Sequence, residues 1–115
     1  MEVTIYHNPK CSKSRSALKI LQEAGIECTV REYLKEPPSL QELSVLQRGF
    51  AGDLVDLVRS KEAKELGLSL TDERSEDEWL QLLVENPKLL QRPLVQIEDE
   101  VLVARPPELL FAYLI

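Results

Sequence analysis

The order of patterns in the first 33 residues constrains the fold more than any other feature of this chain. Val3–Tyr6 is a β-branched and aromatic run that ends at the turn-forming pair Asn8-Pro9. Apolar residues then recur at helical spacing over about residues 12–24, and Gly25 stands where a helix would stop. Residues 28–33 alternate as a second strand. Since one helix between two neighbouring strands normally makes them parallel, the opening predicts a β-α-β unit.

The middle of the chain is predicted to be a helical insertion over about residues 39–90. Ser39 with Glu42, and Ser75 with Glu78, have the spacing of a capping box and mark two helix starts. Leucine and valine recur there as apolar stripes with charged opposite faces. Trp79, on the second of these helices, is expected to lie in the core.

The C-terminal part predicts a hairpin and a last helix. Two apolar runs, residues 94–97 and 101–104, flank a three-residue acidic turn, Glu98 to Glu100. A helix is expected from Pro106-Pro107 through Tyr113. The whole order is typical of an α/β, thioredoxin-like fold, in which β-α-β and β-β-α halves form a mixed four-stranded sheet. With 115 residues, one domain over residues 1–115 is expected.

The charge of the chain is uneven. The net charge is −6, but residues 1–35 carry six cations and four anions, whereas residues 36–115 carry 8 cations and 16 anions. The acidic total argues against nucleic acid and anionic membrane surfaces as partners. No run approaches the length of a membrane span and the first residues lack a signal-peptide pattern, so a cytoplasmic protein with reduced thiols is expected. A monomer is the default expectation.

Cys11 is the candidate nucleophile. It falls at the junction of the first strand and the first helix, where the amide groups of Ser12, Lys13, Ser14 and Arg15 would point toward the sulfur. Such amides, with nearby cations, lower a thiol pKa and would also hold a small tetrahedral oxyanion. His7, Lys10, Lys13 and Arg15 are the candidate cations. Cys28, within a strand pattern, is interpreted as a packed core thiol.

Other cysteine chemistries fit the spacing poorly. A disulfide oxidoreductase would carry cysteine where Ser14 stands, and a phosphatase loop would place more residues between Cys11 and Arg15. A cysteine protease would have only His7 as its base. Two cysteines at this separation match no zinc-site spacing, so no metal is expected. The pattern therefore indicates a single-thiol site whose resolving thiol comes from another molecule.

The segment Ile5–Arg15 resembles the opening motif of the glutaredoxin-coupled arsenate reductase family, in its short branch. Further stretches of the chain resemble that family's segments: Tyr33–Ser39, Leu57–Lys61 with Leu66–Leu68, Asn86-Pro87, Gln91–Val95 and Ala104–Glu108. The resemblance places the family's nucleophile on Cys11 and its oxyanion-handling arginines on Arg59, Arg92 and Arg105. It also places His7, Ser14 and Arg15 around the thiolate. Arg92-Pro93 occupies the place where thioredoxin-like folds carry a cis proline.

The resemblance implies that the Cys11 thiolate attacks arsenate held by Arg92, Arg105 and the helix-start amides. Glutathione as co-substrate and glutaredoxin as partner would supply the reducing electrons, with Arg59 stabilising the As(III) intermediate. No bound cofactor is implied. Three arginines suit a dianion, because each presents a planar fork of donors and stays charged; each one taken alone fits a surface salt bridge equally well.

Two alternatives stay open at this point. One is a glutathione-dependent thiol reductase that shares Cys11 but acts on another substrate. The other is a regulator like the Spx proteins, which have this fold and bind RNA polymerase without catalysing a reaction. Those Spx proteins that sense oxidation use a C-x-x-C pair, which Cys11 with Ser14 does not provide. The three arginines favour anion chemistry over partner binding.

Overall fold

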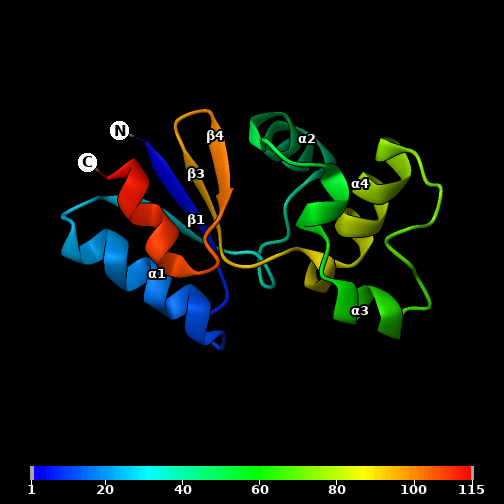
Figure 1. Cartoon of the computed structure of the whole chain (residues 1–115), viewed down its shortest axis with the longest axis horizontal. Coiled ribbons are helices and arrows are strands. Elements are labelled where there is room, and N and C mark those ends of the chain that lie inside the picture. Colours follow the sequence, from blue (N-terminus) through cyan, green and yellow to red (C-terminus); the bar gives the residue numbers. More distant parts are fainter. Residues whose placement is uncertain (1, 115) are drawn as a thin grey trace.

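A mixed four-stranded sheet forms the centre of the computed structural model, which describes residues 2–114 (Figure 1). The strands are β1 (Val3–His7), β2 (Cys28–Glu32), β3 (Leu94–Ile97) and β4 (Glu100–Val103). Their spatial order is β2-β1-β3-β4; β1 and β2 are parallel, and the two other pairs are antiparallel. The α1 helix (Ser12–Glu23) connects β1 to β2. The predicted α/β fold with a mixed four-stranded sheet is therefore confirmed.

The segment between β2 and β3 is helical, as predicted. It contains α2 (Leu40–Gly49), α3 (Ser60–Glu65), α4 (Glu76–Glu85) and two short 3-10 helices, η1 (Leu54–Leu57) and η2 (Pro87–Leu89). Both capping boxes form: the hydroxyl of Ser39 accepts from the Glu42 amide, and that of Ser75 accepts from the Glu78 amide, each at 3.1 Å. These side chains satisfy amides that would otherwise lack partners at the start of α2 and α4.

Two hydrophobic clusters cover opposite faces of the sheet. Neighbouring side chains of a strand point to opposite faces, so Ile5 belongs to one cluster and Tyr6 to the other. The α1 cluster joins the sheet to α1 and to the C-terminal 3-10 helix η3 (Pro107–Tyr113). The insertion cluster joins the sheet to α2, α4 and their neighbours, and contains Trp79, 3% exposed. Figure 1 shows the sheet between these two groups of helices.

The C-terminal segment departs from the prediction in its type of helix. Residues 107–113 form the 3-10 helix η3 instead of an α-helix. Pro106 and Pro107 supply no amide hydrogens to the first turn, and the Leu109 amide donates to the Pro106 carbonyl, a bond between residues three apart. Leu110 is fully buried in the α1 cluster. Burial of Leu110 and Pro107 therefore fixes a segment whose backbone is wound more tightly than expected.

The hairpin and the second strand also differ from the sequence-based expectation. Glu100 pairs with Ile97, so the turn contains two residues instead of three. Glu98 takes the left-handed conformation at φ 53°, and two-residue turns of this kind fit the twist of paired strands. In β2, Val30 is 45% exposed because β2 is at the edge of the sheet, whereas Tyr33, just after the strand, is fully buried.

Two peptide bonds before proline are cis in the structure. They are Arg92-Pro93, at the place where thioredoxin-like folds carry a cis proline, and Arg105-Pro106. They lie before β3 and after β4, so they belong to the same end of the hairpin. Within residues 2–114, no helix has the length and apolar character that crossing a membrane would require.

Candidate active site

Cys11 is the N-cap of α1 and is partly exposed. Its own amide donates to the Asn8 carbonyl at 3.0 Å, and its carbonyl accepts from the Arg15 amide at 3.0 Å. These two bonds hold the residue between the loop that ends β1 and the first turn of the helix. The sulfur is thus placed at the positive end of the α1 dipole, where a negative charge is favoured.

The pKa of Cys11 is lowered from that of a free thiol. Burial is the largest single influence and would raise this pKa, but the interactions that favour the thiolate together outweigh the effect of burial. These are, in order, the backbone amide of Ser14, the guanidinium of Arg92 as a hydrogen-bond donor, the backbone amide of Lys13, and the charge of Arg92. The site therefore stabilises a thiolate with helix-start amides and one arginine, which are also the groups that bind an oxyanion.

A buried hydrogen-bond network fixes the loop beneath Cys11. The hydroxyl of Ser14, whose residue is fully buried, lies 2.6 Å from His7 Nδ1 and accepts from the Asn8 amide at 3.0 Å. Burial lowers the pKa of His7; the charge of Glu32 opposes this change, and that of Arg15 adds to it. A lowered pKa favours the neutral ring, which makes His7 a weaker candidate than the sequence suggested for a cation beside the thiolate. His7 instead orients Ser14.

The remaining residues of the opening motif lie around the loop. Arg15 Nη1 donates to the Pro9 carbonyl at 2.9 Å, so its side chain turns back along the loop. Lys13 contributes its backbone amide to Cys11, while its side chain is exposed. Ser12 is exposed as the first residue of α1. The cation that acts directly on the sulfur is Arg92, far away in the sequence, and not one of the neighbouring basic residues.

Arg92 and Arg105 lie at the same end of the β3–β4 hairpin. Arg92 precedes β3, Arg105 follows β4, and Arg105 Nη1 donates to the Arg92 carbonyl at 3.3 Å. Arg92 Nε is buried and has no hydrogen-bond partner. The hairpin thus brings one guanidinium to the Cys11 sulfur and links the other to its backbone.

Arg59 is the N-cap of α3, held by its amide, which donates to the Leu89 carbonyl at 2.7 Å. Its Nε lies 3.1 Å from Glu62 Oε2, and its Nη1 is buried without a partner. A cavity of about 150 Å³ brings Arg59 and Arg105 together. It is lined by Arg59, Ser60, Lys61, Glu62, Gln91 and Arg105. A cavity of this volume accommodates a molecule as large as benzene, so a tetrahedral oxyanion fits.

Two residues at the site were missed by the sequence analysis. Asn8 was interpreted only as a turn residue, but its side-chain Oδ1 also accepts from the Lys10 amide at 3.0 Å and so shapes the loop. Tyr33 was assigned to the end of the second strand and to a family segment, yet it is fully buried beside Asn8 and Arg92. The available signal was an aromatic residue directly after the strand that neighbours β1.

The second cysteine is remote from this chemistry. Cys28 begins β2 and packs against the α1 cluster, and burial raises the pKa of its thiol. This agrees with a packed core thiol. Among residues 2–114, no three side chains of His, Cys, Asp or Glu gather in a way that could hold a metal ion.

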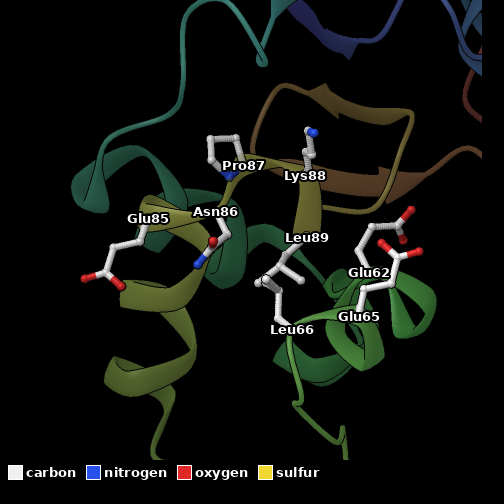
Figure 2. A pocket seen from close by; sticks show the side chains of 8 residues that line it. All are labelled: Glu62, Glu65, Leu66, Glu85, Asn86, Pro87, Lys88 and Leu89. Atoms are coloured by element: carbon white, nitrogen blue, oxygen red, sulfur yellow. The ribbon is translucent and has the colours of Figure 1, made fainter.

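A further cavity of about 380 Å³ lies in the insertion (Figure 2). It is lined by Glu62, Glu65, Leu66, Glu85, Asn86, Pro87, Lys88 and Leu89. None of these residues belongs to the Cys11 loop or to the hairpin arginines. Three carboxylates would also repel an oxyanion. We therefore place the candidate site at Cys11 and its arginines.

Comparison with known proteins agrees with this geometry. A model of the ArsC family matches residues 6–112. The chain belongs to the ArsC family. An arsenate reductase of Rhizobium meliloti (strain 1021) is 41% identical to this ArsC-family chain over 109 residues, which cover 94% of the chain and 78% of that protein. The uncharacterized protein YfgD of Escherichia coli (strain K12) is 40% identical over 109 residues, which cover 93% of the chain and 92% of that protein.

A solved structure of an arsenate reductase from Vibrio cholerae superposes on this ArsC protein with a TM-score of 0.89. It is 39% identical, and the match covers 97% of both chains. The predicted family is therefore confirmed, and relatives named as arsenate reductases support an oxidoreductase.

Proposed function

We propose that this ArsC-family protein reduces arsenate to arsenite through a Cys11 thiolate, with glutathione and glutaredoxin as reductants. One observation carries the proposal: the guanidinium of Arg92 and the amides of Ser14 and Lys13 act together on the sulfur of Cys11. The same donors suit a thiolate and an oxyanion that approaches it. A nucleophile and its anionic substrate therefore share one set of positive groups.

The first step is attack by Cys11 Sγ on the arsenic of arsenate. A sulfur–arsenic bond forms and one arsenic–oxygen bond breaks, and the departing oxygen leaves as water with two protons of dihydrogen arsenate. Arg92, Arg105 and the α1 amides neutralise the anion, because guanidinium groups bind tetrahedral oxyanions through paired donors. No change of oxidation state occurs in this step.

Reduction follows when glutathione binds the arsenic. Two electrons pass from two thiols to As(V), giving As(III) and a disulfide. Over the whole reaction, dihydrogen arsenate, two thiols and one proton give arsenous acid, one disulfide and one water. Glutaredoxin takes up the glutathione and resolves the adduct. The second cysteine of this chain does not take the resolving part, since its thiol is packed against the α1 cluster. Arg59 stabilises the As(III) intermediate.

A coupled assay tests the proposal. Arsenite formation is measured with purified protein, arsenate, glutathione and glutaredoxin, and again with thioredoxin in place of the glutathione system. Cys11→Ser is expected to abolish turnover, whereas Cys28→Ser is the matched control and retains it. Turnover that survives in Cys11→Ser would exclude the thiolate mechanism. Turnover that depends on thioredoxin alone would exclude the proposed reductant.

A further inference from the structure

Tyr33 lies at the carboxyl ends of the two parallel strands. β1 pairs with β2 so that His7 stands opposite Glu32, and the next residues, Asn8 and Tyr33, therefore come level just beyond the sheet. The side chain of Tyr33 is fully buried in the insertion cluster. A tyrosine is thus fixed beside the loop that carries Cys11, on the opposite side of the sheet from the α1 cluster.

Two buried polar atoms of this region have no hydrogen-bond partner. The hydroxyl of Tyr33 forms no aligned hydrogen bond, and neither does Arg92 Nε. The hydroxyl lies beside the side chains of Arg92 and Asn8. A buried unpaired group costs stability, so its presence calls for an explanation. A tyrosine oxygen accepts hydrogen bonds and Nε–H donates them, so the two groups are complementary.

A neutral partner suits Arg92 better than a carboxylate would. Burial raises the pKa of Tyr33, which keeps the phenol uncharged at neutral pH; Arg92 opposes this change, and Cys11 adds to it. An uncharged hydroxyl orients a guanidinium without cancelling its charge. Arg59 shows the contrasting case, since its Nε lies 3.1 Å from the carboxylate of Glu62. The guanidinium at the thiolate therefore keeps its full charge for sulfur and substrate.

We propose that Tyr33 is a positioning residue, whose hydroxyl accepts a hydrogen bond from Arg92 Nε and so aims the guanidinium at the Cys11 sulfur and at an oxyanion bound there. The effect on the oxyanion rests on the proposed function; the effect on the thiolate does not. Tyr33 acts through Arg92 and does not touch the reacting atoms. Phenylalanine at this position would keep the packing of the ring and remove only the alignment.

The test uses full-length protein with Cys28→Ser, so that Cys11 is the only thiol. The rate of alkylation by iodoacetamide is measured against pH, together with arsenate turnover and thermal unfolding. Tyr33→Phe is expected to move the alkylation profile to higher pH and to lower kcat/KM for arsenate about tenfold, mostly through KM, the change expected for one hydrogen bond to a charged group. The unfolding midpoint is expected to fall only modestly, since the packing of the ring is kept and one buried hydrogen bond is lost.

Tyr6→Phe is the matched control. Tyr6 belongs to the same cluster, but the charges that act on it are those of Glu42 and Arg31. The same shift in Tyr6→Phe, or an alkylation profile of Tyr33→Phe that coincides with the parent protein, overturns the proposal. Arg92→Ala supplies a second test: once Arg92 is gone, Tyr33→Phe is expected to change the profile no further, and independent effects of the two substitutions overturn the proposal.

Failure of the proposed function is distinguishable from failure of this inference. If the parent protein does not reduce arsenate but the alkylation profile still shifts in Tyr33→Phe, the arsenate assignment is wrong and the positioning role stands. If turnover and its KM are the same with and without the hydroxyl, and the profile is unchanged, the positioning role is wrong and arsenate reduction stands.

Discussion

Replacing Ser14 with alanine removes the centre of the network below Cys11. The hydroxyl of Ser14 accepts from the Asn8 amide at 3.0 Å and lies 2.6 Å from His7 Nδ1. All three residues are buried. Alanine leaves two polar groups without their partner in a region that water does not reach. The substitution therefore tests whether this network, and not the helix alone, holds the active-site loop.

The size of the effect follows from the two orphaned groups. A buried donor or acceptor that loses its partner costs about 1–3 kcal/mol. Two such groups give about 2–6 kcal/mol, which the better helix propensity of alanine, worth roughly 0.5 kcal/mol, reduces to about 1.5–5.5 kcal/mol. This is a large part of the ~5–15 kcal/mol by which a typical domain is stable. In a domain of this size it lowers the unfolding midpoint by roughly 10 °C.

Chemical denaturation measures this loss, and Ser16→Ala is the control. Ser16 is exposed on the same helix, so this variant gains the same propensity without breaking a buried bond. Ser14→Ala is expected to unfold at a clearly lower urea concentration than Ser16→Ala. Equal midpoints for the two variants would refute the reasoning, because they would mean that the Ser14 hydroxyl contributes nothing to stability.

Three other measurements address the same region and the insertion. Burial lowers the pKa of His7, the only histidine, so the unfolded chain takes up a proton at a higher pH than the folded protein does. The stability that His7 contributes is therefore full above the usual histidine pKa of about 6.5 and is lost as the pH falls through the lower pKa of the folded state. Urea unfolding at pH 7.5 and 5.5 should show this loss, and a loss of equal size in His7→Asn would contradict it. Iodoacetamide at pH 7 should label Cys11 before Cys28, since their pKa values move in opposite directions, and a fast phase that persists in Cys11→Ser would disprove this order. Gly49→Ala should lower the unfolding midpoint, because the added Cβ would meet the Asp99 carbonyl; an unchanged midpoint would show that the hairpin turn gives way.

The fold was predictable because its signals are local. Strand–helix–strand order, the two capping boxes and the hairpin runs are all patterns of neighbouring residues, and each one formed in the structure. The wrong predictions, of the turn length and of the last helix type, also have local causes. The number of residues in the hairpin turn depends on whether Glu98 takes a left-handed conformation, and the type of the last helix depends on which carbonyl the Leu109 amide bonds. Neither the turn length nor the helix type can be read from the spacing of apolar residues.

The site was predictable only where the motif itself carries it. Cys11 at a helix start follows from the chain order, but its partner Arg92 is 81 positions away, and the family resemblance alone pointed to it. The influence of the nearby cations on the sulfur was overestimated, since Arg15 turns toward the Pro9 carbonyl and burial lowers the pKa of His7. Tyr33 could not be assigned from sequence, because its role depends on a strand register that places it level with Asn8. The roles of the three arginines stay predictions.

The two hydrophobic clusters have a consequence for local unfolding. The α1 cluster holds the helix that begins at Cys11 against one face of the sheet. The insertion cluster lies on the other face, and there Arg59 is the N-cap of a short helix that is linked to η2. Partial opening that separates the insertion from the sheet would expose its amides to hydrogen exchange while those of α1 stay protected. In that opened form the thiol and its helix dipole persist and Arg59 is lost. Under the proposed function, such an opening would remove Arg59 from the As(III) step and leave Cys11 at its helix start.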